Sequence, residues 1–270
     1  MRATRIIAMT AALCATLICA RGGIASEVPA DCAAYVPYGL PVTTGQHPTT
    51  LACRAGYLSQ VDGDTLQPDW VAWSLTSERA LGCEPRSNAF HYDDKLPVGF
   101  YATPGDYALS GRDLGHLSPD RDNAVSADME RDSFDVPTNM SPQAPGLNRL
   151  EWESLEETTR AWTHTLGDLY VIDGPIFSGA PSTIGQHKIA VPSAYWKVII
   201  AGKQAVAFTM TNDTHPKGPL TPFVVSIADI ERQAGITIPV PAGVDKTKVA
   251  LPWQADVTGF AKAKKAACAH

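Results

Sequence analysis

Hydrophobic and polar residues alternate over several short segments, and this two-residue period predicts β-strands. β-Branched and aromatic residues are enriched in these segments, which are residues 51–61, 69–76, 168–173, 195–200, 204–210 and 222–227. Asp62-Gly63-Asp64 lies between the first two segments and predicts the turn of a hairpin. The spaced aspartates of this turn resemble a calcium-binding loop only superficially.

One long segment has a helical period instead. Apolar side chains recur at roughly helical spacing from Leu147 to about Trp162, and Glu151, Glu153 and Glu157 fall on the side predicted to face water. Residues 228–234 predict a short helix, whereas residues 84–115 show no regular pattern. Strands in series with a few inserted helices predict an α+β fold, with a mostly antiparallel central sheet and flanking helices.

The composition fits this prediction. The 270 residues are 44% hydrophobic and 19% charged, and the 21 glycines and 21 prolines follow no period. These values exclude a disordered chain, a collagen and a coiled coil. We expect one domain over residues 26–270, because its length and apolar content suffice for one large core.

The amino terminus has the pattern of an export signal. Arg2 and Arg5 precede an apolar run over residues 6–20, and small residues follow, which predicts a signal peptide over residues 1–25. A membrane-anchoring helix is the alternative, but the run is short for a span, and no later stretch reaches 18 apolar residues. We therefore expect a secreted or periplasmic protein. Removing residues 1–25 lowers the net charge from −6 to −9, which argues against a generally basic, nucleic-acid-coating surface.

Four of the six cysteines remain after this cleavage. An even number of cysteines in an exported chain predicts two disulfides. Of the three possible pairings we favour Cys32–Cys53 with Cys83–Cys268, and the second bond is the less certain of the two. A zinc site is disfavoured because the chain has no C-x-x-C pair and no clustered histidines.

Candidate chemistry is concentrated in residues 112–160. A histidine at a predicted strand end, a polar loop and a helix carrying Asn148, Glu156 and Arg160 would place several polar groups at one cleft. Taken singly, each residue has a structural explanation. His116 could be a buried structural histidine, Asn148 a helix N-cap, and Glu156–Arg160 an i,i+4 surface ion pair. Their combination favours a functional site.

This combination resembles the sugar-nonspecific DNA/RNA endonucleases of the ββα-metal, or His-metal finger, superfamily. That family carries Asp-Arg-Gly-His, then an Asn-x-x-Pro-Gln loop, then Asn, Trp, Glu and Arg on a helix. The matching residues here are Asp113, Gly115, His116, Asn139, Pro142, Gln143, Asn148, Trp152, Glu156 and Arg160. The likeness covers roughly residues 50–235 and includes Arg54, which follows Cys53 on an early strand.

The resemblance implies a catalytic apparatus with a ββα-metal finger. His116 would be the general base that takes a proton from the attacking water, as a neutral imidazole can near neutral pH. Asn148 would be the direct protein ligand of Mg²⁺, with Mn²⁺ as an alternative ion, and Glu156 would contact the ion through water.

The same resemblance assigns the remaining residues to substrate and loop. Arg54 and Arg160 would bind phosphate oxygens of DNA or RNA. Asn139 and Gln143 would shape the loop around His116, and Asp113 would position it. Whether the chain is a homodimer stays open.

One position departs from the family pattern, because Leu114 stands where the family has arginine. The loss of a cation could lower affinity or rate, and Arg112 is the candidate to compensate for it. Two readings other than an active enzyme follow. One is a catalytically weak nucleic-acid-binding or uptake protein on the same fold, and the other is a disulfide-bonded extracellular binding domain.

Overall fold

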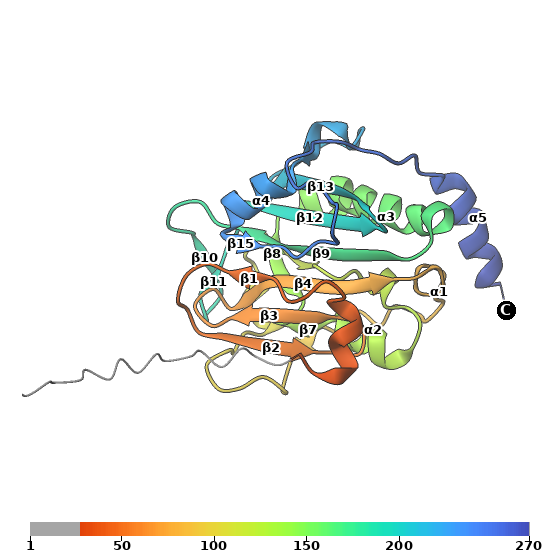
Figure 1. The fold of residues 1–270 in the computed structure, drawn as a ribbon. Helices are drawn as coiled ribbons and strands as arrows, with labels where there is room; N and C mark the ends of the chain where they lie inside the picture. Colours follow the sequence, from red (N-terminus) through yellow and green to blue (C-terminus); the bar gives the residue numbers. More distant parts are fainter. Residues whose placement is uncertain (1–27, 270) are drawn as a thin grey trace, which may run out of the picture.

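The computed structural model describes residues 28–269, so the predicted signal peptide lies outside the described residues. Its centre is a seven-stranded sheet in the order β14-β13-β12-β9-β4-β3-β2, antiparallel at every pairing (Figure 1). The strands are β2 (Thr49–Cys53), β3 (Leu58–Asp62), β4 (Gln67–Leu75), β9 (Leu169–Ile176), β12 (Ala194–Ala201), β13 (Gln204–Thr211) and β14 (Val224–Val225).

Both faces of this sheet are buried, and helices cover each of them. On β4, Val71 and Trp73 face a core shared with α3 (Glu153–Leu166) and α5 (Val257–Ala267), whereas Trp70 and Ala72 face a second core. The second core is closed by η1 (Ala30–Tyr35) and α4 (Ile227–Ala234). The alternation along the strands thus becomes two apolar layers, and the α+β prediction with a large antiparallel sheet is confirmed.

Two predicted strands were wrong in detail. Residues 51–61 form two strands, because the chain turns between Arg54 and Tyr57, where the Arg54 N–H donates to the Tyr57 carbonyl at 2.9 Å. Residues 222–227 begin in the 3₁₀ turn η5 (Thr221–Phe223) and leave only two residues for β14. The predicted turn at Asp62-Gly63-Asp64 is confirmed, since the Asp64 N–H donates to Asp62 Oδ1 at 2.7 Å.

The predicted helix begins where expected but is longer and changes its winding. Its first turn is the π-helical segment η4 (Leu147–Trp152), and α3 continues to Leu166 before Gly167, whose φ of 81° ends it. Single π turns inside helices occur often at functional sites. The solvent-facing prediction for Glu151 was wrong: the side chain is buried, and Glu151 Oε2 accepts from the Gly218 N–H at 3.1 Å.

Shorter elements connect these layers. Besides α3, the sequence pattern predicted α4, but it did not predict α1, α2 or α5. The remaining helices are α1 (Ser77–Ala80), η2 (Pro104–Tyr107), η3 (Asp120–Asp122) and α2 (Ala127–Ser133). Four two-stranded pairs complete the fold: β1 (Val42–Thr43) with β15 (Ile236–Thr237), β5 (His91–Tyr92) with β7 (Asp135–Val136), β6 (Asp113–His116) with β8 (Met140–Gln143), and β10 (Thr183–Ile184) with β11 (Ile189–Ala190).

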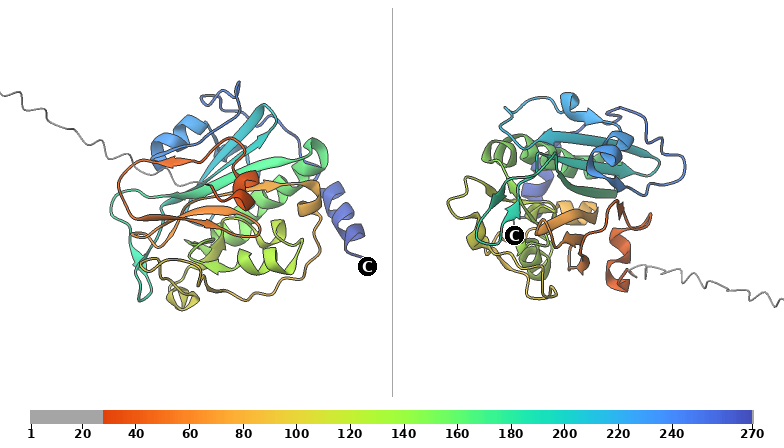
Figure 2. Two further views of the ribbon diagram at one scale, coloured as in Figure 1. Left: turned by 60° about the horizontal axis from the view of Figure 1, so that its bottom comes forward. Right: turned by 90° about the vertical axis from the view of Figure 1, so that its left-hand side faces the viewer.

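The β6–β8 ribbon leads directly into η4 and α3, and together they form a ββα unit. Its antiparallel register pairs His116 with Met140 and Gly115 with Ser141. The β6–β8 ribbon positions His116, and the helix that follows it positions the residues from Asn148 onward. Figure 2 shows this yellow-green part of the chain on the side of the sheet opposite α4.

Both favoured disulfides are present, Cys32–Cys53 and Cys83–Cys268. The second bond joins the carboxyl end of α5 to the segment after α1. Such bonds indicate that the chain folds in an oxidising, exported environment. Within residues 28–269, every helix is too short or too polar to cross a bilayer.

Candidate active site

A cleft of about 190 Å³ opens where the ββα unit meets η3 and the segment after α1. Four of the residues predicted for the site line it: His116, Asn148, Glu156 and Arg160. Leu114, the departure from the family pattern, lines it too. The other lining residues are Arg86, Pro119, Asp120, Arg121, Arg149 and Glu153.

His116 is a largely buried, neutral imidazole that lines the cleft. Only 8% of the residue is exposed, and its ring packs edge-on against Phe134 at 4.9 Å between ring centroids. Its Nε2 has no hydrogen-bond partner among residues 28–269. Burial, opposed by the charge of Asp120 and assisted by that of Arg86, lowers the pKa of His116 to about 4. A neutral histidine can accept a proton.

Asn139 and Gln143 support His116 from behind. Asn139 is fully buried; its Oδ1 accepts from the Ser118 N–H at 2.8 Å, and its Nδ2 donates to the Ser118 and Ser133 carbonyls. Gln143 is also buried, and a Cβ at Gly115 would lie 2.3 Å from its Cδ. This close approach explains the glycine before the histidine. Asn139 is therefore held within the loop by these bonds and is not among the residues that line the cleft.

Asp113 contacts both Asn148 and Arg149. Asn148 Nδ2 donates to Asp113 Oδ2 at 3.0 Å. Arg149 holds the same carboxylate through Nε at 2.8 Å and Nη2 at 2.6 Å. Since a carboxylate only accepts, it binds the amide nitrogen of Asn148 and leaves the amide oxygen free for another ligand. Asn148 is not an N-cap, because Gly146 occupies that position.

Glu156 lies about two turns beyond Asn148, in a site that disfavours its charge. Burial raises the pKa of Glu156 to about 8, although the charges of Lys197 and Arg160 act to lower it. Lys197 lies behind the cleft on β12, paired with Asp173 at 2.9 Å and packed over the rings of Trp73 and Trp152. A cation in the cleft would offset the desolvation of the Glu156 carboxylate.

Arg160 is not part of a surface ion pair with Glu156. The residue is 3% exposed, and its Nη1 donates to Asp122 Oδ1 at 3.0 Å, while Asp122 Oδ2 accepts from Trp73 Nε1. The guanidinium is therefore fixed from below and presents its remaining donors to the cleft.

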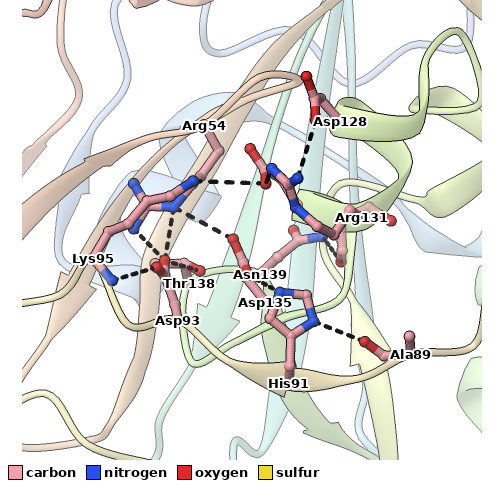
Figure 3. A network of polar contacts seen from close by, with 12 residues as sticks. Arg54, Ala89, His91, Asp93, Lys95, Asp128, Arg131, Asp135, Thr138 and Asn139 are labelled. Atoms are coloured by element: carbon pink, nitrogen blue, oxygen red, sulfur yellow. Dashed lines mark hydrogen bonds and ion pairs between the residues drawn. The ribbon is translucent and has the colours of Figure 1, made fainter.

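Arg54 is not among the residues that line this cleft, so the structure does not bring it together with His116, Asn148 and Glu156. Its guanidinium lies in a separate buried cluster, in which Nε and Nη2 both donate to Asp93 and Nη1 donates to the Cys53 carbonyl at 2.9 Å (Figure 3). Asp135 Oδ2 is 3.4 Å from Arg54 Nε, and Thr138 also donates to Asp93. The turn between β2 and β3 directs the side chain to this cluster.

Other cations occupy the cleft in place of Arg54, and the sequence analysis missed them. Arg149 neighbours Asn148 on the helix, Arg121 follows the histidine loop, and Arg86 comes from the irregular segment after α1. The Arg86 guanidinium carbon lies 5.0 Å from the centre of the Phe134 ring, and Arg86 also pairs with Asp120. Arg112 lines an adjoining hollow that shares Arg86, Leu114, Asn148 and Arg149 with the cleft.

The donor set fits a hard divalent cation. The free Asn148 amide oxygen and the Glu156 carboxylate face the same cleft, and both are oxygen ligands of the kind that Mg²⁺ prefers. Neither a thiolate nor a second imidazole lines the cleft among the described residues, so zinc fits less well.

The chain is similar to known nucleases over most of its length. The DNA/RNA non-specific endonuclease family matches residues 38–245. Mitochondrial endonuclease G of Bos taurus is 34% identical over 218 residues, covering 74% of this chain and 70% of the bovine protein. Nuclease C1 of Cunninghamella echinulata is 33% identical over 203 residues, covering 68% and 80%. A crystal structure of EndoG in complex with EndoGI superposes with a TM-score of 0.71 at 26% identity, covering 78% of this chain and 92% of that one.

A ββα unit with this cleft and these relatives defines a nuclease. The chain belongs to the family of DNA/RNA non-specific endonucleases, and the family inferred from the motif is thereby confirmed. It is a hydrolase that cleaves nucleic acids internally.

Proposed function

We propose that the protein hydrolyses phosphodiester bonds of DNA and RNA with little sequence preference, using His116 as general base and one Asn148-bound divalent cation. The observation that carries this proposal is the juxtaposition of two groups in one cleft. These are the neutral imidazole of His116 and the amide oxygen of Asn148.

Each residue then has a chemical task. The neutral imidazole of His116 takes the proton of the attacking water, a role that contributes about 10²–10⁴-fold to rate. Asn148 holds Mg²⁺ or Mn²⁺ directly, oriented by Asp113, and Glu156 contacts the ion through water. The bound ion supplies electrostatic stabilisation of the phosphate and of the leaving 3′ oxygen.

Arginines bind the phosphate. Arg160, fixed by Asp122, faces the phosphate from the helix side, and Arg86, Arg121 and Arg149 surround the cleft mouth. We assign to Arg149 the cation that the family carries at position 114, because it lines both hollows beside Leu114, as Arg86 does, and in addition shares the Asp113 carboxylate with Asn148. Contacts to phosphate rather than to base edges account for low sequence preference.

The proposal includes export as one domain. Residues 1–25 are proposed as a cleaved signal peptide, residues 26–270 as the mature nuclease domain, and the periplasm or the medium as its location. The two disulfides support this location.

A digestion assay tests the function. The mature protein is incubated with supercoiled plasmid and with single- and double-stranded RNA and DNA, in Mg²⁺ and in EDTA. We expect nicking and fragmentation of all four substrates in Mg²⁺ only. Retention of nucleic acid without cleavage would instead favour the catalytically weak binding protein that Leu114 suggests. If the protein neither retains nor cleaves nucleic acid, the result favours the extracellular binding domain.

A further inference from the structure

The C-terminal helix α5 lies outside residues 38–245, where the family match ends, yet it is fixed beside the active site. Phe260 is buried in the core with Trp162 and Trp253. The Cys83–Cys268 disulfide ties the end of the helix to the segment that leads to Arg86. Lys264 Nζ donates to the carbonyls of Ala80, at 3.2 Å, and Gly82. The helix therefore has a defined position next to α1 and α3 (Figures 1 and 2).

A hollow of about 400 Å³ lies between α5, α3 and η3. It shares Arg121 and Arg160 with the catalytic cleft, so the two hollows are adjacent and have a common wall. Four cationic side chains and one carboxylate, Glu157, line it. Part of its floor is apolar and comes from α5.

Two of these cations, Arg121 and Lys265, are available to a ligand, whereas Arg160 and Lys264 have protein partners. Arg121 pairs only loosely with Glu157, at 3.6 Å and with 56% and 40% of the side chains exposed, and such exposed pairs contribute little. Lys265 is exposed on α5, and Lys262 is exposed one turn earlier. From Val257 to Ala267 the helix carries three lysines and no acid, in a chain whose net charge is −6.

We propose that α5 extends the nucleic-acid-binding surface, so that a strand leaving the catalytic cleft passes Arg121 and is held by Lys265 through a phosphate distant from the cleaved bond. This inference rests on the proposed function, since it requires the strand to be seated at His116. Long substrates gain a contact that short ones cannot reach. Because the contact is made to phosphate, it adds affinity without sequence preference.

The test compares two lysine variants that change charge equally. Lys265→Glu removes the proposed contact, and Lys203→Glu is the matched control in the β12–β13 turn, where it lines a different hollow. Both side chains are exposed, so folding should be preserved, as melting temperatures will show. Binding of fluorescent 30-nucleotide and 4-nucleotide DNA is measured in EDTA, and KM and kcat are measured in Mg²⁺ on the same lengths.

We expect Lys265→Glu to weaken binding of the 30-mer about three- to tenfold and to reduce the slope of log Kd against log salt by about one. Its kcat, and its KM for the 4-mer, should equal those of the wild type. Equal 30-mer affinities for Lys265→Glu and Lys203→Glu would overturn the inference, as would equal losses on both lengths. A wild type that binds with this length dependence but never cleaves would refute the proposed hydrolysis and leave the α5 contact standing.

Discussion

Two polar clusters in this protein contain the same residue types and differ in what their groups contact. The Arg54 cluster joins one guanidinium to Asp93 and Asp135, and His91 Nε2 lies 2.7 Å from Asp135 Oδ1 (Figure 3). Its charged groups contact one another. The catalytic cleft is lined instead by the neutral imidazole of His116 and by Asn148, whose amide nitrogen is bound by Asp113 and whose amide oxygen is left for another ligand.

This difference distinguishes charged groups that stabilise the fold from groups that can bind a substrate. A buried arginine paired with carboxylates is neutralised where it stands and has few donors left for a ligand. A group held rigidly from one side and left free on the other is prepared for substrate. Arg160, bound below by Asp122 and open to the cleft, belongs to the second kind.

The largest expected effect distinguishes the two histidines. His116→Ala should lower kcat about 10²–10⁴-fold, because the general base is lost. His91→Ala, the matched change in the Arg54 cluster, should leave kcat near that of the wild type, since His91 contacts only Asp135 and the Ala89 carbonyl. Single-turnover rates on duplex DNA give the comparison. Equal losses in both variants would show that the clusters are not functionally distinct.

Replacing Arg54 should lower stability, whereas replacing Arg149 should lower activity. Arg54→Ala leaves Asp93 buried without its guanidinium, and breaking a buried pair of this kind destabilises by about 3–5 kcal/mol. Arg149→Ala removes a side chain that is 68% exposed, so the melting temperature should hold while kcat/KM falls about tenfold. Thermal denaturation and steady-state kinetics on both variants measure this. An Arg54→Ala protein with wild-type stability and lost activity would show that Arg54 acts in catalysis.

The clusters should also respond oppositely to pH. His116 has a folded pKa of about 4, below its usual 6.5, so its neutral form stabilises the fold at neutral pH and this contribution is lost as pH falls from about 6.5 to 4. Burial and the charge of Asp93 raise the pKa of Asp135 to about 7, so its protonated form is favoured and stability is lost as pH rises through 7.

Melting temperatures from pH 4 to 9 test this contrast. Asp135→Asn should gain on the wild type as pH rises toward 8, and His116→Ala should gain on it as pH falls toward 4. The acid limb of wild-type kcat/KM should have its midpoint nearer 4 than 6.5, because the base works as neutral imidazole. Parallel pH curves for the three proteins would contradict these assignments.

The smallest effect concerns Leu114, which lines the cleft beside Arg149. If Arg149 supplies the missing cation, Leu114→Arg should raise kcat/KM of the wild type only about twofold but restore most of the activity lost in Arg149→Ala. Kinetics of the two single variants and the double variant form the cycle. Strictly additive effects would mean that the two positions do not replace each other.

Much of the fold could be read from the sequence, because alternation and helical period report burial directly. They located β4, β9, β12, β13 and the start of the long helix. They missed α5, whose alanines and lysines show little apolar periodicity, and the break at Arg54–Tyr57, which depends on a local turn. The prediction that Glu151 faces solvent was wrong because its carboxylate is buried against the Gly218 N–H, which belongs to a segment distant in the sequence.

The residues of the site can be divided in the same way, into those that the sequence predicted and those that it did not. His116, Asn148, Glu156 and Arg160 lie within one continuous ββα unit, so sequence spacing sufficed to bring them together. Arg54 and Arg86 come from outside it, and their positions depend on how the β2–β3 turn and the segment after α1 pack. An exposed, unpatterned arginine such as Arg86 gives no sequence signal of its own.

The most direct test of the account is the cleavage rate as a function of Mg²⁺ concentration for the wild type, Asn148→Ala and His116→Ala. Chelation should abolish wild-type cleavage. We predict that Asn148→Ala shifts the half-saturating Mg²⁺ concentration upward and lowers the rate, because the direct ligand is gone. His116→Ala should lower the plateau and keep the midpoint. Cleavage that persists in EDTA, or an Asn148→Ala titration superimposable on the wild type, would contradict the proposed site.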